Sequence, residues 1–342
     1  MSAAQTLKPA SARRSAVAPH ARALPLRVGT RASPLALAQT RAFLGVLTRF
    51  CPVLRGMQVF EEHPIRTTGD AVQDRRLADI GGKGLFAKEI HEALLAGRIN
   101  FAVHSLKDLE TQLPPGIVLG CTLRREDARD ALVLGRHCNK PDPSEPFAVF
   151  APKAVVGTAS VRRQAQLKHV RPDLSVQVIR GNVQTRLAKL AAGQIAATLL
   201  ALAGLRRLGL ENQVSVVLDP EIMVPAAGQG IVAVTLREAD SGLRSLLGLL
   251  EDPEARAAAS AERGLLASLD GSCRTPIGGH ATLRDGQLHL TGLVAREDGS
   301  FLLKRSVRGP AADAEALGRE LGASLRADSP SDLFASRGER PA

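Results

Sequence analysis

Short apolar runs alternate with amphipathic stretches along most of the chain. Apolar runs typical of buried strands lie at residues 24–28, 59–60, 101–103, 155–156, 176–179 and 197–200. Apolar residues at helical spacing follow most of these runs, at 34–46, 85–95, 161–167, 183–191 and 202–208. The first of these helices has a typical start, with Ser33 as N-cap and Pro34 as its first residue. Because strands alternate with helices of this length, the pattern predicts βαβ units and mostly parallel sheets.

The pattern changes toward the C-terminus. A Pro/Gly-rich link at 224–230 precedes an apolar strand at 231–236, which can return to the first sheet. Beyond it the pattern predicts a helix at 253–269, strands at 280–283, 288–294 and 302–307, and a final helix at 311–325. We therefore expect two α/β lobes, with parallel or mixed sheets and a hinged cleft between them, followed by a small α+β domain.

The expected domain boundaries follow from these changes. Residues 1–23 form a basic N-terminal extension, and residues 24–125 together with 230–250 form the first domain. The second domain covers 126–229 and the third covers 251–342. A length of 342 residues agrees with two or three domains.

Composition narrows the classes of function. The chain has nine Phe and no Trp or Tyr, so its cores must consist mainly of Leu, Val, Ile and Ala. Scarce aromatic residues speak against a base-stacking platform for nucleic acid. No apolar run approaches the roughly 20 residues that span a bilayer, so we expect a soluble chain that contacts no membrane.

The chain is basic, and several arginines stand where a strand ends and a helix begins. The formal net charge is +11, which suggests an anionic partner: nucleic acid, an anionic membrane or a polyacidic small molecule. Arg31, Arg162, Arg163 and Arg180 lie at strand–helix turns, where backbone N–H groups and the positive helix end favour anions. Guanidinium groups there suit carboxylates or phosphates. Pairing with surface acids is the alternative interpretation.

Two further segments could contribute to a site. The segment 81–84 contains three glycines and Lys83 before a helix, and lacks the spacing of a phosphate-binding loop. It is either a mobile basic loop that closes over an anion or a plain surface turn. Asp108 follows a buried strand and lies beside Lys107, so it either exchanges protons with a bound substrate or caps a turn.

The four cysteines form neither a CxxC pair nor a zinc-like spacing, so we expect no metal site and a reduced, intracellular compartment. Cys273 stands beside Arg274, and a neighbouring cation lowers a thiol pKa and favours attack by the thiolate. A small buried cysteine is the alternative. The Ala-rich N-terminal stretch carries basic residues and no acid before Glu61, which fits a disordered tail or an organelle transit peptide.

In order along the chain, nine motifs resemble the porphobilinogen deaminase (hydroxymethylbilane synthase) family over about residues 26–325. They are RVGTRASPLALAQ, GGKGLFAKE, AVHSLKDL, REDARDAL, VGTASVRRQAQL, VIRGNVQTRL, LALAGLRRLGL, PAAGQG and GSCRTPIGGHA. The resemblance implies three domains, of which the first two are similar to the lobes of a periplasmic binding protein. It implies a transferase that condenses four porphobilinogen molecules head to tail, with release of ammonia, to hydroxymethylbilane in tetrapyrrole (heme or chlorophyll) biosynthesis.

The resemblance also assigns roles to residues by motif position. It implies a dipyrromethane cofactor bound through a thioether to Cys273, and a catalytic carboxylate at Asp108. Cofactor contacts fall on Arg31, Ser33, Lys83, Lys107, Ser160, Arg162, Arg163, Arg180, Arg186 and Gln229. Substrate contacts fall on Arg31, Lys83, Phe86, Lys88, Arg180, Arg186 and Arg207. Each porphobilinogen ring carries an acetate and a propionate, so the growing chain is a polyanion that explains the positive charge.

The implied partner is thus a small molecule, and neither nucleic acid nor a membrane. We expect a cytoplasmic monomer, or a plastid protein if residues 1–23 are a transit peptide. The competing hypotheses are a non-enzymatic two-lobe binding protein for a polycarboxylate, and a nucleic-acid-binding protein.

Some positions depart from the family pattern. Ser272 stands where a glycine is usual, Ala159 replaces the first of two serines, and Val161 replaces a leucine. Glu110 stands where a proline often follows the aspartate–leucine pair. We expect these changes to affect fine binding geometry more than activity. An extra segment at 137–150, rich in Pro and polar residues, is expected to be a surface loop.

Overall fold

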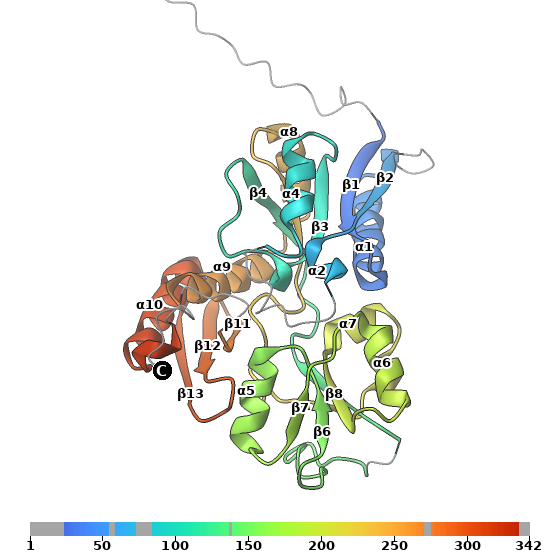
Figure 1. Ribbon diagram of the computed structural model, residues 1–342. Coiled ribbons are helices and arrows are strands. Elements are labelled where there is room, and N and C mark those ends of the chain that lie inside the picture. Colours follow the sequence, from blue (N-terminus) through green and yellow to red (C-terminus); the bar gives the residue numbers. More distant parts are fainter. Residues whose placement is uncertain (1–23, 55–58, 73–83, 137–138, 270–274, 335–342) are drawn as a thin grey trace, which may run out of the picture.

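The computed structural model describes residues 24–54, 59–72, 84–136, 139–269 and 275–334. Two five-stranded sheets and one three-stranded sheet, each packed with helices, make up these residues (Figure 1). The expected class, two α/β lobes and a small C-terminal α+β unit, is confirmed. Of the two expected arrangements, parallel or mixed, each large sheet has the mixed one.

The first sheet has the strand order β2-β1-β3-β10-β4. Its strands are β1 (Leu26–Arg31), β2 (Phe60–Ile65), β3 (Phe101–Ser105), β4 (Ile117–Thr122) and β10 (Val232–Arg237). β10 runs antiparallel to both β3 and β4, so the late strand does return to the first sheet. The packed helices are α1 (Pro34–Phe50), the short α2 (Thr68–Ala71), α4 (Lys88–Leu95) and α8 (Ser241–Gly248).

The second sheet has the order β7-β6-β8-β5-β9. Its strands are β5 (Asp130–Leu134), β6 (Val155–Gly157), β7 (Ser175–Gln177), β8 (Ala197–Ala201) and β9 (Val216–Val217). β6, β7 and β8 are parallel, whereas β5 runs antiparallel to β8 and β9. Its helices are α5 (Val161–Val170), α6 (Val183–Ala191) and α7 (Leu202–Arg207).

The prediction of a surface loop at 137–150 is wrong for the end of that segment. Phe147 and Phe150 are only 3% and 5% exposed and belong to the core of the second sheet. Arg171 at the end of α5 donates hydrogen bonds to the backbone oxygens of Phe147 (2.5 Å) and Phe150 (3.1 Å). Burial of the two rings is favourable because each Phe removes a large apolar area from water. The Pro-rich composition of the segment did not reveal this.

The third sheet is an antiparallel meander covered by two helices. Its strands are β11 (Ile277–Arg284), β12 (Gln287–Ala295) and β13 (Leu302–Pro310), and its helices are α9 (Pro253–Ser268) and α10 (Ala314–Ala327). Short 3₁₀ turns complete the described elements: η2 (Pro52–Leu54), η3 (Leu106–Asp108), η4 (Glu211–Gln213), η5 (Ala311–Asp313) and η6 (Ser331–Leu333). α9 and α10 pack so closely that a Cβ on Gly318 would overlap the Ala261 carbonyl.

One buried ion pair joins the third unit to the segments that connect the two large sheets. Arg125 lies on the first connecting segment and donates to Glu262 of α9 at 2.6 Å. The Glu262 carboxylate also accepts from the backbone N–H of Gly228 (2.6 Å), on the second connecting segment, and of Ala281 (2.7 Å) on β11. The third unit is thus anchored where the chain passes between the lobes, as its position in Figure 1 shows.

Candidate active site

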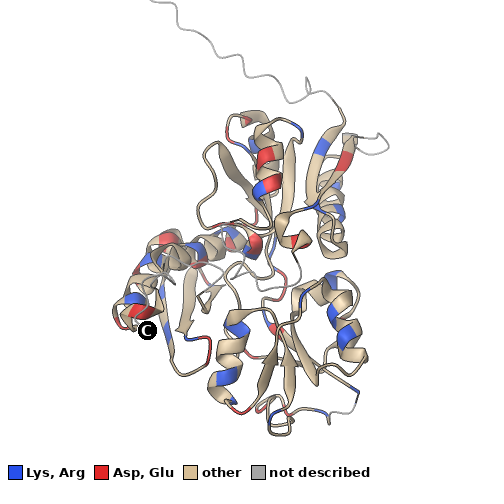
Figure 2. Ribbon diagram, in the orientation of Figure 1, with Lys and Arg blue, Asp and Glu red and all other residues tan. Residues whose placement is uncertain are grey.

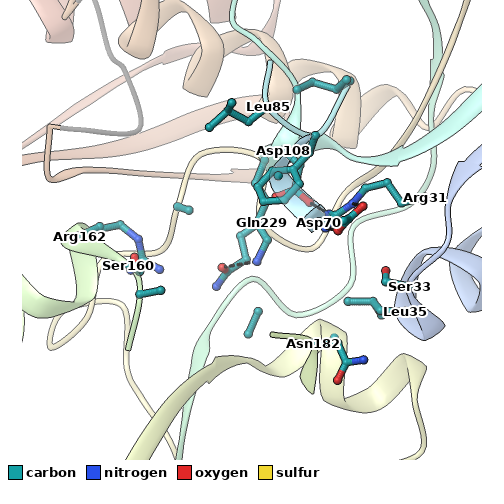
Figure 3. Close-up of a pocket in the computed structure, with 18 of the residues that line it drawn as sticks. Arg31, Ser33, Leu35, Asp70, Leu85, Asp108, Ser160, Arg162, Asn182 and Gln229 are labelled. Carbon is teal, nitrogen blue, oxygen red and sulfur yellow. Dashed lines mark hydrogen bonds and ion pairs between the residues drawn. The ribbon is translucent and has the colours of Figure 1, made fainter. Parts of the chain in front are cut away.

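A cavity of about 800 Å³ lies where the three units meet. Its lining comes from the ends of β1, β3 and β8, from the starts of α1, α5 and α6, and from the second connecting segment and β11. Figure 3 shows Arg31, Asp70 and Asp108 grouped on one wall, with Arg162 and Ser160 across the cavity. Figure 2 shows that Lys and Arg also occupy outer helices, so only part of the positive charge lies at the cavity.

Three helices begin at the cavity, and a polar side chain caps each. Ser33 accepts from the Ala36 N–H at 3.3 Å, as the Ser33–Pro34 pair predicted for α1. Ser160 caps α5 through the Arg163 N–H at 3.4 Å, and Asn182 caps α6. Helix starts carry partial positive charge and favour anions, so their convergence makes the cavity attractive to carboxylates.

Arg31 organises one wall of the cavity. Its guanidinium donates to Asp108 at 3.0 Å and to Asp70 at 2.5 Å, and lies 4.0 Å from the centre of the Phe86 ring. Burial opposes the charge of Arg31, but its hydrogen bond to Asp70 and the charges of both acids outweigh burial and raise the pKa of Arg31. Arg31 therefore stays charged and fixes the orientation of Asp108.

Arg162 and Arg163 hold a buried carboxylate between them. Asp130, at 0% exposure, lies 2.8 Å from an Arg162 nitrogen and 2.7 Å from an Arg163 nitrogen. Burial of Asp130 opposes its ionisation, but the two arginines lower its pKa well below the usual range. The Nε atom of each arginine is buried and has no hydrogen-bond partner among the described residues.

Lys107 and Gln229 link this pair of arginines to the wall that carries Asp108. The Lys107 ammonium donates to the Gln229 side chain at 3.2 Å, and Gln229 donates in turn to Asp130 at 2.8 Å. The accessible surface of Lys107 faces the cavity. Loss of hydration there, together with the charge of Arg163, outweighs Asp108 and lowers the Lys107 pKa to about 8.

Arg180 and Arg186 lie on the wall formed by the second sheet. Arg180 donates to the backbone oxygen of Gly69 in α2 at 3.0 Å, a contact between the two lobes. Arg186 donates to the Gly181 oxygen at 3.0 Å. Burial, with the nearby charges of Arg163 and Arg180, lowers the Arg186 pKa to about 10. Crowded cations of this kind favour a bound anion that relieves their repulsion.

The structure thus brings most of the predicted residues together. The cavity lining includes Arg31, Ser33, Phe86, Lys107, Asp108, Ser160, Arg162, Arg163, Arg180, Arg186 and Gln229. Arg207 and Lys88 do not contribute to it: Arg207 donates to the Gly230 oxygen at 2.6 Å, and Lys88 is exposed at the start of α4. Cys273 and Lys83 lie outside the described residues, as do Ser272 and Cys138.

The sequence interpretation missed several lining or supporting acids and amides. Asp70, Glu110 and Asn182 line the cavity, and Asp130 lies behind it. Asp130 stands in a motif that was recognised, and Asn182 follows Arg180 at a strand–helix turn. Asp70 gave no comparable signal, because its pairing with Arg31 joins residues 39 positions apart.

The donor set fits a polycarboxylate such as dipyrromethane. The lining offers several guanidinium groups and three helix starts, and two buried Nε–H groups have no partner among the described residues. Guanidinium groups bind carboxylates in a planar, bidentate manner. The fold and the cavity therefore define a class: two-lobed α/β proteins whose arginine-lined cavity receives a small molecule with several carboxylates.

The chain belongs to the porphobilinogen deaminase family. Residues 26–245 match the family model of the porphobilinogen deaminase dipyrromethane cofactor binding domain, and residues 257–327 match its C-terminal domain. A porphobilinogen deaminase from Nitrobacter hamburgensis is 48% identical over 299 residues, covering 87% of this chain and 92% of the relative. Those from Paracoccus denitrificans and Synechococcus elongatus are 46% and 43% identical, each over 91% of this chain and at least 95% of the relative.

An ancestral cationic amino acid solute binding protein is among the solved structures similar to the chain, with a TM-score of 0.40 and 14% identity, over 66% of this chain and 87% of that one. Among the described residues, none of the helices combines the length and the apolar character needed to cross a membrane.

Proposed function

We propose that this protein condenses four porphobilinogen molecules stepwise, with release of ammonia, to the linear tetrapyrrole hydroxymethylbilane. One observation carries the proposal: Asp108 is held by Arg31 at 3.0 Å on the wall of an arginine-lined cavity, in a chain of this family. A carboxylate beside several cations suits a substrate that carries both acidic side chains and a basic aminomethyl group.

Asp108 is proposed as the catalytic residue. Loss of ammonia from the aminomethyl group requires proton transfer and leaves an electron-poor ring. A carboxylate can exchange the proton with the leaving amine, and its negative charge stabilises the positive charge on the pyrrole nitrogens. Arg31 limits the motion of Asp108, and Asp70 holds Arg31 from the other side.

The dipyrromethane, when bound by a thioether to Cys273, supplies the primer on which the chain of rings grows. The side chains proposed to hold its carboxylates are Arg31, Ser33, Lys83, Lys107, Ser160, Arg162, Arg163, Arg180, Arg186 and Gln229. The free Nε–H groups of Arg162 and Arg163 support this proposal, since each can donate to an added carboxylate. Ser33 and Ser160 contribute chiefly by fixing helix starts.

The incoming substrate is proposed to bind beside these groups. Its acetate and propionate pair with Arg31, Lys83, Lys88, Arg180, Arg186 and Arg207, and its ring lies against Phe86. The proposal is weakest for Lys88 and Arg207, because neither lines the described cavity. Either could act only after a change in the position of the lobes.

We further propose that the chain divides into the domains 24–125 with 230–250, 126–229 and 251–342, after the extension 1–23. We propose a monomer that acts in the cytoplasm and needs neither nucleic acid nor a membrane. The relatives named above are bacterial, which supports the cytoplasm over a plastid.

Intact mass spectrometry tests the cofactor proposal. The protein is expressed in a host that makes porphobilinogen, beside Cys273→Ser. We expect an excess equal to two porphobilinogen units less two ammonia molecules in the wild type alone. If the wild-type mass stays unmodified after added porphobilinogen as well, the proposed attachment is wrong.

Turnover of porphobilinogen tests the catalytic proposal. Asp108→Asn should fold and bind substrate but lose kcat by roughly 10²–10⁴-fold, the range expected for a lost proton-transfer group. Near-normal turnover in this variant would exclude Asp108 as the catalytic residue. Binding of porphobilinogen by the wild type with no condensation would instead favour a non-enzymatic binding protein.

A further inference from the structure

Glu110 lies two residues after Asp108, on the segment that follows η3. Its side chain is only 9% exposed and turns back toward α4, with Oε1 3.5 Å from Nδ1 of the buried His91. The other carboxylate oxygen, Oε2, is buried and has no hydrogen-bond partner among the described residues. A carboxylate kept in such surroundings is costly unless neighbouring charges compensate it.

The charge of Glu110 is retained despite this burial. Burial opposes ionisation, but His91 and the nearby Arg263 outweigh it and lower the Glu110 pKa below its usual value. The carboxylate is therefore an anion at neutral pH. It also lies near the start of α4, which has no side-chain N-cap, and the positive end of a helix favours an anion.

The Glu110 carboxylate contacts the turn at 84–87. A Cβ added to Gly84 would overlap Glu110 Oε1, so the carboxylate lies directly against the Gly84 backbone. Gly84 has a φ of +74°, a conformation that disfavours other residues. The same turn carries Phe86, and its Leu85 oxygen accepts a hydrogen bond from the Gly69 N–H at 2.8 Å.

These contacts form a closed series that includes Asp108, the proposed catalytic residue. Asp108 accepts from Arg31, and Arg31 lies over Phe86 at 4.0 Å. The chain leads from Phe86 back to Gly84, which touches Glu110 on the same short segment as Asp108. Movement of the 84–87 turn would therefore displace the ring beneath Arg31 and, through Arg31, the carboxylate of Asp108.

We propose that Glu110 is a positioning residue, which holds the 84–87 turn against the catalytic segment and keeps the Phe86 ring beneath Arg31. The proposal rests on the function proposed above and adds a residue that acts through the wall that carries Asp108. Glu110 acts through Gly84 and Phe86 and does not contact the reacting atoms.

A double-mutant cycle between Glu110 and Phe86 tests the proposal. Glu110→Gln keeps the size but removes the charge that His91 attracts. We expect kcat/KM for porphobilinogen to fall about tenfold, through both kcat and KM, within the range that misplacement of a catalytic or binding group costs. In a Phe86→Ala background the same change should cost less than about twofold, because the ring that Glu110 positions is already absent.

A purely structural role gives a different result. A general loss of stability would lower kcat/KM equally in both backgrounds, and such additivity would overturn the proposal. Glu92→Gln, at an exposed position of α4, is the matched control and should leave both parameters unchanged. Where Glu110→Gln does not fold, Glu110→Asp replaces it, since its shorter side chain keeps the charge but withdraws from Gly84.

The test is separable from that of the proposed function. The cycle is repeated on the affinity for porphobilinogen, by calorimetry in an Asp108→Asn background in which turnover is slow. A wild type that does not condense porphobilinogen refutes the proposed function, and the binding cycle still decides the role of Glu110. A wild type that condenses it, with additive effects in both cycles, refutes the positioning role alone.

Discussion

Asp130 offers a sharp test of how the buried charges are balanced. Its carboxylate lies between the guanidinium groups of Arg162 and Arg163, at 2.8 and 2.7 Å, and all three side chains are 6% exposed or less. Asp130→Asn keeps the shape but removes the negative charge. The two guanidinium groups would then be buried side by side without the negative charge of Asp130. They would keep their hydrogen bonds to the backbone oxygens of Val224 and Leu199, which carry no net charge.

The expected cost is large. Breaking a buried ion pair by removing one partner typically destabilises a protein by about 3–5 kcal/mol, because an uncompensated charge stays buried. The matched control is Asp173→Asn, which breaks the exposed pair with Arg171 and should cost at most about 1 kcal/mol. The folded-state pKa of Asp130 is depressed, so its contribution should be complete at neutral pH and diminish as the pH falls below about 4.

Urea unfolding in two forms of the protein measures this effect. In the Cys273→Ser form, which should lack the cofactor, Asp130→Asn should show the full loss. In the loaded form the loss should be smaller, because cofactor carboxylates would supply anions to the same arginines. A loss no larger than that of Asp173→Asn in the unloaded form would refute the assumption that Asp130 compensates two buried charges.

Two remaining predictions concern Lys107 and Gly318. Because loss of hydration at the cavity lowers the pKa of Lys107 to about 8, kcat/KM should fall as the pH rises from about 7 to 9. Lys107→Met should have a lower kcat/KM at pH 7 and should lack this part of the pH profile. An unchanged profile in Lys107→Met would show that another group titrates there. Gly318→Ala should destabilise by about 1–3 kcal/mol in urea unfolding, since its Cβ would overlap the Ala261 carbonyl across the α9–α10 contact. Ala316→Ser on the same helix is the control, and equal stability of the two variants would contradict the tight packing.

Periodicity predicted the elements that carry the site. The helix expected at 161–167 corresponds to α5, and the start of α1 at Ser33 and Pro34 was predicted with its cap. Local sequence determines these features, because caps and helical spacing act over a few residues. The sequence left the choice between parallel and mixed sheets open, since the antiparallel placement of β5 and β10 depends on distant partners.

The motifs identified most of the basic side chains that line the cavity, but not the acidic side chains that pair with them. Arg162 and Arg163 were expected to bind cofactor carboxylates, and in the structure both also form ion pairs with Asp130. The segment with Phe147 and Phe150 was interpreted as a surface loop from its polar neighbours. Composition averages over a segment, whereas burial is decided side chain by side chain.

The sequence by itself determined the class of fold, the family and the residues that could carry the chemistry, because periodicity, caps and motifs are local properties of the chain. Only the tertiary structure decided which acidic side chain contacts which basic side chain or backbone segment. Asp70 with Arg31, Asp130 with two arginines, and Glu110 with the backbone of Gly84 are contacts between segments distant in sequence. Such contacts arise from packing of whole elements, and the energies of buried charges depend on those neighbours and not on the residues alone.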